Sequence, residues 1–277
     1  MTERNVVDLY NHNEGDEPLK VLFYDIENTS IQVETWRTYQ ADAIRVTREW
    51  YILAFAWKWM GEKSAHGLTL ADFPSHFKRG HRDDSQLVKK LWELFNEADV
   101  LITHNGNYHD QRKSNARFIA HGLTPPSPYQ QIDTYITAKR KFAFTSNKLD
   151  ELGKYLGVGR KIRIHPEVWN DCMNGDPKAF ALMKKYNIQD VLLLERVYKK
   201  MRAWMPNHPS IGVSSPRRPS FASREDLNCP RCGSNKLSSI GWRRTLASRY
   251  RRFQCLKCGG FCSSSIRIPA NKGVKSE

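Results

Sequence analysis

The run Val21-Leu22-Phe23-Tyr24-Asp25-Ile26-Glu27 (VLFYDIE) decides the fold, because an apolar segment ends in two acidic residues. Consecutive apolar side chains are typical of a strand that is buried on both faces of a sheet. Side chains alternate along a strand, so Asp25 and Glu27 are expected to point to the same face. An Asp-x-Glu pair is common by chance, and other parts of the chain have to show what this one does.

Strand and helix patterns alternate after this run. Apolar strands are expected at 51–59 and 99–103, and helices at 85–98, 110–120, 147–156 and 176–204. This order predicts an α/β domain, a mixed sheet flanked by helices, over residues 19–205. Residues 1–18 are expected to form a flexible lead-in, 206–226 a Pro/Ser-rich linker, 227–268 a small second domain and 269–277 a tail.

The small domain carries two Cys-x-x-Cys pairs, each followed by glycine: Cys229 with Cys232, and Cys255 with Cys258. Four thiolates favour tetrahedral zinc and leave no open coordination position, so one structural Zn²⁺ is expected. A redox dithiol would require a thioredoxin-like context, which is absent. Cys262 could replace one ligand, but we interpret it and Cys172 as free thiols.

The net charge of +15 is concentrated in the C-terminal part of the chain. Residues 206–277 hold 14 Lys and Arg against 3 Asp and Glu, whereas residues 1–205 hold 30 against 26. This asymmetry favours nucleic acid as a partner. Arginines and an aromatic residue between the cysteine pairs are candidates for phosphate contact and base stacking: Trp242, Arg243, Arg244, Arg249, Arg251 and Arg252. In the alternative interpretation, Trp242, Tyr250 and Phe253 form a small core.

No apolar run reaches the roughly 18 residues that a membrane span needs, and the polar N-terminus lacks a signal-peptide core. The expected location is the cytoplasm, where the 6 cysteines would be thiols or metal ligands rather than disulfides.

Further acidic residues follow in positions that could converge on Asp25 and Glu27. Asp110 comes after a loop that contains Asn105, and Tyr186 and Asp190 lie four residues apart on one helix face. Carboxylates that converge without matching cations repel one another, and divalent metal ions relieve that repulsion.

The segments VLFYDIE, ITHNGNYHD and YNIQD, in this order, resemble the three motifs of DEDDy-type 3′–5′ exonucleases. The resemblance spans about residues 20–204 and is strongest to the proofreading domains of family B DNA polymerases and to stand-alone phage exonucleases. It implies a ribonuclease H-like fold. Separately, the cysteine-containing C-terminal domain resembles the zinc ribbons found in many nucleic-acid-processing proteins. By position, Asp25, Glu27, Asp110 and Asp190 would bind two Mg²⁺ or Mn²⁺ ions. Tyr186 would orient the attacking water, and Asn105 would contact nucleic acid.

The implied reaction is two-metal-ion hydrolysis from a 3′ end to 5′-mononucleotides, with DNA as the expected substrate. A structure-specific endonuclease and a non-catalytic nucleic-acid-binding module are the alternatives. Only 73 residues follow Trp204, so any polymerase is expected to be a separate partner, as are other replication, repair or recombination proteins. If the protein comes from a phage, its location would be the host cytoplasm.

Several residues have two interpretations. His109 stands where the family has an aromatic residue, and we expect its imidazole to fill that space rather than act as a general base. Asp133 is expected to make a structural hydrogen bond rather than bind metal.

The basic run Arg160–Arg163 could follow the substrate backbone or form a solvated surface. His104 is expected to support the Asp110 loop. Trp36 is expected in the core, although it and Tyr39 could stack on a base.

Overall fold

The computed structural model describes residues 19–39, 42–74, 77, 82–205, 208–209, 227–245, 248–264 and 268–269. The chain divides into two compact units, Lys20–Met201 and a second unit that includes residues from Arg202 onward. The expected lead-in 1–18, nearly all of the linker 206–226 and the tail after Pro269 lie outside the described residues.

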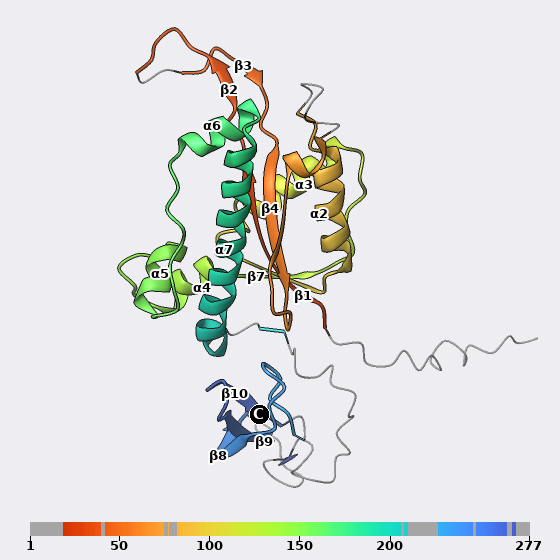
Figure 1. Cartoon of the computed structure of the whole chain (residues 1–277). Helices are drawn as coiled ribbons and strands as arrows, with labels where there is room; N and C mark the ends of the chain where they lie inside the picture. The colour runs from red at the N-terminus through yellow and green to blue at the C-terminus, as the bar shows by residue number, and fades with distance from the viewer. Residues whose placement is uncertain are drawn as a thin grey trace, which may run out of the picture. The chain divides into compact units, whose positions relative to one another are not determined.

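The first unit is built on a five-stranded mixed sheet with the order β5-β4-β1-β6-β7. β4 pairs antiparallel with β1 and with β5, whereas β6 pairs parallel with β1 and with β7. Figure 1 shows the long strands β1 and β4 side by side at the centre. The strands are β1 (Val21–Asn28), β4 (Ile52–Trp59), β5 (His66–Thr69), β6 (Val100–Thr103) and β7 (Gln130–Asp133).

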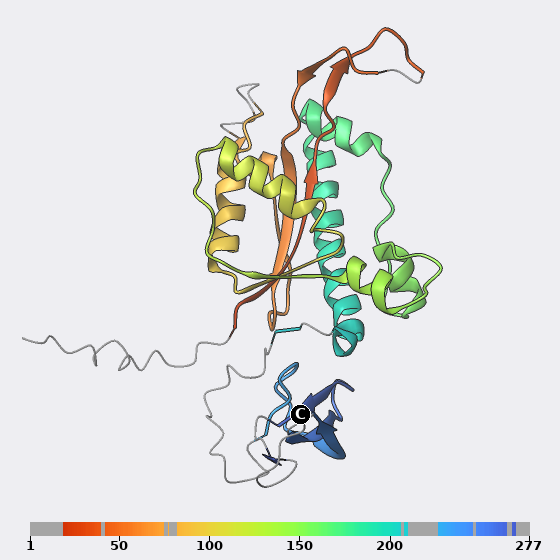
Figure 2. The ribbon, with the colours of Figure 1, turned by 180° about the vertical axis from the view of Figure 1, so that it is seen from behind.

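Helices cover both faces of this sheet, as Figures 1 and 2 show from opposite sides. One core joins the sheet to the first two long helices, and a second core joins it to the last two. The helices are α2 (Ser85–Glu97), α3 (Asp110–Ala120), α4 (Thr134–Lys141), α5 (Leu149–Tyr155), α6 (Glu167–Asn174) and α7 (Pro177–Met201), with 3-10 turns at Leu70–Asp72 and Arg202–Trp204. None of the described helices is long and apolar enough to cross a membrane.

The alternation of side chains along β1 decides where its acidic residues point. Leu22, Tyr24 and Ile26 are buried in the core beneath α2 and α3. Phe23 faces the opposite side and makes an edge contact with Tyr198 of α7, with ring centroids 5.3 Å apart. Asp25 and Glu27 therefore share the face that α7 covers, as the sequence predicts.

A buried ion pair fixes α7 against the centre of the sheet. Lys58 Nζ on β4 lies 2.5 Å from Glu195 Oε2 on α7, and Lys199 Nζ lies 2.7 Å from the other carboxylate oxygen. Removing one partner of such a pair would leave a buried charge uncompensated. The pair therefore helps to set the position of the helix that carries Tyr186 and Asp190.

A short hairpin, β2 (Gln32–Glu34) and β3 (Arg45–Arg48), leaves the end of β1 and returns to β4. Trp36 and Tyr39 on it are 89% and 87% exposed, so the prediction that Trp36 packs in the core is wrong. The physical reason is that this hairpin is a separate two-stranded sheet, which gives Trp36 no core to enter.

The second unit is a small antiparallel sheet around β9, with β8, β10 and β11 as its partners. Its strands are β8 (Leu237–Arg244), β9 (Ser248–Cys255), β10 (Phe261–Ser263) and β11 (Ile268–Pro269). Among its described residues from Leu227 onward, Cys229, Phe253 and Cys255 are the buried hydrophobic ones. So small a core needs additional stabilisation, such as a structural metal ion, to fold stably.

Candidate active site and metal centres

Three of the predicted acids meet between β1 and α7. Asp25, Glu27 and Asp190 each offer a carboxylate oxygen, and these oxygens all lie within 4.8 Å of one another. Asp190 is 1% exposed, because it projects from the face of α7 that covers the sheet. The strand places Asp25 and Glu27 opposite it on the same face. The structure thus brings together residues that are 165 positions apart.

Asp110, the fourth predicted acid, approaches from α3, of which it is the first residue. It is 4% exposed, and its Oδ1 accepts a 3.2 Å hydrogen bond from the backbone N–H of Ile26, the residue between Asp25 and Glu27. Its charge contributes to raising the pKa of Asp25. We call Asp25, Glu27, Asp110 and Asp190 the acid cluster.

The acid cluster holds more negative charge than its surroundings compensate. Burial first, then the neighbouring carboxylates, raises the pKa of Asp25 well above its ordinary value. Burial and Asp190 raise the pKa of Glu27 from 4.5 to about 7, and burial also raises the pKa of Asp190. Buried carboxylates that repel one another favour protons or bound cations.

Lys161 supplies positive charge to the acid cluster. Its Nζ lies 2.6 Å from Asp190 Oδ2. Burial acts to lower the pKa of Lys161, but Asp190 and Asp25 outweigh that effect and raise it. Lys161 is directed into the site and is therefore not part of a solvated surface, whereas contact between the run Arg160–Arg163 and the substrate backbone stays a prediction. Its neighbour Arg160 pairs instead with Asp150, at 2.7 Å, near the surface.

Tyr186 lies one helical turn before Asp190, at the edge of the acid cluster. Its ring centroid is 5.1 Å from Lys161 Nζ and 6.0 Å from the ring of Trp169. Burial, and then the charge of Asp190, raises the pKa of Tyr186, so its hydroxyl keeps its proton at neutral pH. A protonated phenol there can donate a hydrogen bond to a water molecule.

Two residues that the sequence analysis missed bind the acid cluster directly. Asn187 Nδ2 donates to Asp25 Oδ2 at 2.6 Å, and Trp169 Nε1 donates to Glu27 Oε2 at 3.2 Å. The position of Asn187 three residues before Asp190 on the same helix face was a signal for it. Trp169 gave no such signal, because only the tertiary fold brings α6 beside β1.

The loop before Asp110 is held by Asp133. Asp133 accepts hydrogen bonds from the backbone N–H groups of Asn105 (2.9 Å) and Asn107 (3.2 Å) and also caps α4. Its predicted structural role is confirmed. Asn105 adopts a φ of 67°, which turns the chain toward α3; its contact with nucleic acid stays a prediction.

The two histidines of this loop differ in their surroundings. The ring of His104 lies between Thr134 Oγ1 and the Asn147 carbonyl, each 2.9 Å from one ring nitrogen, and burial lowers its pKa to about 4. This agrees with a supporting role. His109 is about half-exposed, with its Nδ1 3.8 Å from Asp110 Oδ1. The imidazole therefore lies beside the acid cluster.

The chemistry of the acid cluster fits divalent cations. Its ligands are hard carboxylate oxygens, which suit Mg²⁺ and Mn²⁺, and its four acids outnumber the single positive charge that Lys161 supplies. A second group, Asp83, Asp84 and His121, also has close ligand atoms. There Arg117 already pairs with Asp84, with its Nε 2.9 Å from Oδ2, so that group needs no metal ion.

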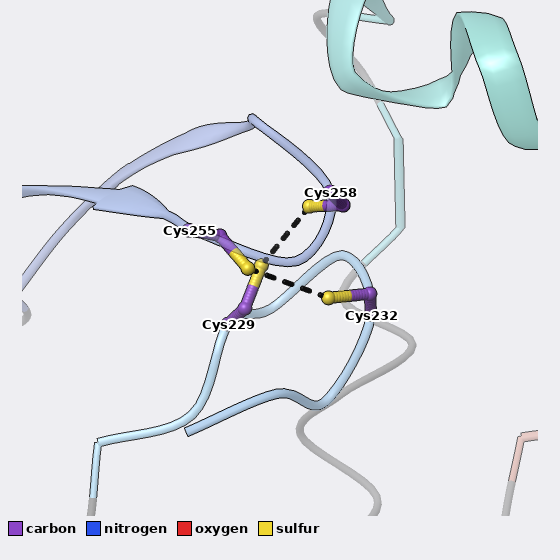
Figure 3. A group of neighbouring side chains, drawn as sticks. All are labelled: Cys229, Cys232, Cys255 and Cys258. Carbon is purple, nitrogen blue, oxygen red and sulfur yellow. Dashed lines mark hydrogen bonds between the residues drawn. The ribbon is translucent and has the colours of Figure 1, made fainter. Parts of the chain in front are cut away.

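The four predicted zinc ligands converge in the second unit (Figure 3). Cys229 Sγ lies 3.7 Å from Cys258 Sγ, and Cys232 Sγ lies 3.6 Å from Cys255 Sγ. A tetrahedral zinc site with Zn–S bonds of 2.3 Å has S–S edges of about 3.8 Å, so the thiols fit a zinc ion. Gly233 and Gly259 have φ angles of 70° and 72°, as the tight turns require.

The predicted arginine and aromatic residues lie on the β8–β9 hairpin. The guanidinium carbons of Arg249 and Arg251 each lie 4.8 Å from the centroid of the Trp242 ring. Arg244 on β8 lies directly opposite Arg249 on β9 in the strand register. The guanidinium carbon of Arg243 lies 6.0 Å from the centroid of the Tyr250 ring, and that of Arg252 lies 5.6 Å from the centroid of the Phe261 ring. Only Phe253 of the three aromatic candidates for the core is buried.

Comparison with known proteins places the first unit in a family. A sequence model of the RNase H superfamily matches residues 22–202, which include the whole acid cluster. The chain belongs to the RNase H superfamily. This confirms the predicted fold: a mixed sheet flanked by helices, with a four-cysteine cluster in the second unit that is compatible with a zinc ribbon.

Among solved structures, this RNase H superfamily protein is similar to the family B DNA polymerase from the hyperthermophilic archaeon Pyrobaculum calidifontis. The TM-score is 0.50 and the sequence identity 18%, over 72% of this chain. The match covers 26% of the polymerase, so this chain spans about a quarter of that protein. The search of curated proteins gave no match. The superfamily and the acid cluster together support a nuclease whose substrate is nucleic acid.

Proposed function

We propose that the protein is a metal-dependent 3′–5′ exonuclease of the DEDDy type that acts on DNA with a free 3′ end. The observation that carries the proposal is the acid cluster itself. Asp25, Glu27 and Asp190 lie within mutual ligand distance, Asp110 is fixed to the backbone between the first two, and Tyr186 stands one turn before Asp190. This is the full residue set of the motifs that the sequence resembles.

The acid cluster would hold two Mg²⁺ or Mn²⁺ ions. When bound, such ions lower the pKa of a water molecule and stabilise charge on the leaving 3′ oxygen. The protein would supply the site in which this occurs. Asn187 and Trp169 orient Asp25 and Glu27 through hydrogen bonds, and Lys161 balances part of the negative charge.

Tyr186 would position the attacking water. Because its pKa is raised, the phenol donates a hydrogen bond to that water rather than acting as its base. Attack at phosphorus then breaks the bond to the 3′ oxygen of the retained strand. The product is a 5′-mononucleotide, and the retained strand ends in a new 3′ hydroxyl.

The second unit would act as a DNA-binding zinc ribbon. One structural Zn²⁺ would stabilise it, and Trp242 with its flanking arginines would contact the strand by stacking and phosphate pairing. The proposed domains are 19–205 and 227–268; the compact units of the chain divide between Met201 and Arg202. A separate polymerase, or another replication or recombination protein, would supply or receive the DNA end.

Digestion of a 5′-labelled single strand tests this proposal. With Mg²⁺ or Mn²⁺, the labelled strand should shorten in single-nucleotide steps from its 3′ end. Asp25→Asn and Asp190→Asn should abolish the ladder, whereas Asp171→Asn, which alters an exposed acid on α6, should leave it unchanged. Equal cleavage by the wild type and the two cluster variants would overturn the proposal.

A further inference from the structure

A polar pocket lies at the end of the sheet from which the β2–β3 hairpin leaves. Its volume is about 560 Å³, and its lining includes Arg48, Trp50, Tyr51, Arg82 and Arg117. Tyr51 pairs with Thr29, two residues beyond Glu27: each residue donates one 3.0 Å hydrogen bond to the other. The pocket therefore begins where the catalytic strand ends.

Helix α3 connects this pocket with Asp110. Lys113 follows Asp110 by three residues, about 4.5 Å along the helix axis. Its Nζ lies 4.4 Å from the centroid of the Trp50 ring, and the Arg117 guanidinium carbon lies 5.9 Å from the same ring. A cation held over an aromatic face is fixed in position without losing its charge. Trp50 thus holds the ammonium group of Lys113 against a residue that lines the pocket.

The pocket offers cations that the protein itself does not neutralise. Arg117 is paired with the buried Asp84. In contrast, Arg48, Arg82 and Lys113 form no ion pair with any acid in the described part of the chain. Of the two acids in the lining, Asp83 accepts hydrogen bonds from Ser85 at the start of α2, and Glu49 is exposed.

The backbone of the pocket carries strain as well. Arg82 has a φ of 41°, in the left-handed region that residues other than glycine seldom adopt. Conformations of this kind are concentrated at ligand-binding sites, where the surrounding structure holds them in place. The side chain of Arg82 is half-buried against the hydroxyl of Tyr51, which limits its freedom.

We infer that Arg48, Arg82 and Lys113, with Trp50 as support, bind backbone phosphates of the strand that remains after each cut. We call these four residues the α3 pocket. The inference rests on the proposed function and extends it to a substrate subsite. An exonuclease releases a single nucleotide on one side of the cut bond, so only the retained strand is long enough to reach a pocket whose lining includes Arg117, seven residues or about 10 Å along α3 from Asp110. A nucleic-acid backbone, which carries one negative charge per phosphate, is a better ligand for three unpaired cations than a protein surface of mixed charge.

Equilibrium binding tests the α3 pocket without requiring hydrolysis. The probe is a fluorescein-labelled 20-nucleotide single strand, titrated with the zinc-loaded full chain without Mg²⁺ or Mn²⁺ at several salt concentrations. Arg48→Ala, Arg82→Ala and Lys113→Ala should each weaken binding by about three- to tenfold and lower the salt slope by about 0.7. Lys113→Arg should retain most of the affinity.

Lys200→Ala is the matched control, since Lys200 is exposed and lies ten residues, about 15 Å, along α7 from Asp190. It removes one charge as well, but should leave affinity and slope near the wild-type values. If the Arg82 variant unfolds, Arg48→Ala and Lys113→Ala suffice, because both side chains reach the surface. Unchanged affinity and slope in these variants would overturn the inference.

Failure of this inference can be separated from failure of the proposed function. Variants that lose affinity while the wild type shows no hydrolysis would support the α3 pocket and reject the exonuclease. Normal hydrolysis by the wild type together with unchanged binding by the variants would support the exonuclease and reject the α3 pocket. A polyglutamate peptide is the competing probe: variants that lose peptide binding but keep DNA binding would assign the pocket to an acidic protein and overturn the inference.

Discussion

Asn187 Nδ2 donates a 2.6 Å hydrogen bond to Asp25 Oδ2, so the centre of α7 is joined directly to the end of β1. The same helix carries Tyr186 immediately before Asn187 and Asp190 one turn later. The side-chain amide is neutral, and it can orient a carboxylate without adding to the negative charge of the acid cluster. The first and third motifs are thus held together even before any metal ion binds.

Replacing Asn187 should therefore impair both geometry and charge. Asn187→Ala removes the donor and should lower the hydrolysis rate by about 10- to 100-fold through misplacement of Asp25. Asn187→Asp should also lower the melting temperature at pH 7, since it buries one more carboxylate. Rates of 3′-end digestion and thermal melting measure these effects. Asn174→Ala, at an exposed position on α6, is the control; equal rates for both alanine variants would contradict the assigned role.

The stability of the protein without Mg²⁺ or Mn²⁺ should depend on pH in a defined direction. Because the pKa of Glu27 rises from 4.5 to about 7, and those of Asp25 and Asp190 also rise, the folded state holds protons that the unfolded chain releases. The free energy of unfolding should then fall as the pH rises from about 4.5 through about 7. Glu27 alone could account for up to roughly 3 kcal/mol.

Thermal melting of the zinc-loaded protein between pH 5 and pH 8 measures this effect. Glu27→Gln should reduce the fall in melting temperature, and added Mg²⁺ or Mn²⁺ should reduce it as well, because the cations replace the protons. The opposite slope, with stability rising through this range, would show that the acid cluster is not buried and crowded as described.

Lys161 should matter most when no divalent cation is present. Lys161→Met removes the ammonium group 2.6 Å from Asp190 and leaves that buried acid without its partner. Because Lys161 is partly exposed, the loss of stability should be about 2 kcal/mol rather than the full cost of an unpaired buried charge. Saturating Mn²⁺ should reduce the difference in the free energy of unfolding between this variant and the wild type, as measured by denaturant unfolding. Lys154→Met, at an exposed position of α5, should leave the free energy of unfolding at the wild-type value with and without Mn²⁺.

The zinc ribbon should depend on its four cysteines and not on the fifth cysteine in that unit. Cys258→Ser should reduce the zinc content, measured by atomic emission, from one ion per chain to nearly none. Cys262→Ser should retain the ion, because Cys262 is not one of the four converging thiols. Loss of zinc should weaken DNA binding and flatten its salt dependence while hydrolysis of short strands persists. Full zinc content in the Cys258 variant would contradict this arrangement.

The fold and the acid cluster could be predicted largely from local patterns. The apolar run before Asp25, the helix that begins at Pro177, and the one-turn spacing of Tyr186 and Asp190 are local, and the structure contains each of them. The cysteine spacing likewise predicted a cluster whose distances fit zinc.

The contributions of Trp169, Lys161 and Trp36 could not be predicted in this way. Trp169 reaches Glu27 only because α6 packs beside β1, a contact across 142 residues. Lys161 follows Arg160 in a basic run, and only the path of the chain after α5 turns one inward and the other outward. Trp36 looks like a core residue by type, but its place on a two-stranded hairpin exposes it.

The central claim is that the acid cluster cuts only from a free 3′ end. The most direct measurement compares a circular single-stranded DNA with its linearised form, both incubated with Mg²⁺ or Mn²⁺. The linear strand should be converted to 5′-mononucleotides in a reaction that Asp25→Asn abolishes, and the circle should remain intact. Cleavage of the circle by the wild type, lost in the same variant, would show that this site is an endonuclease and would contradict the account.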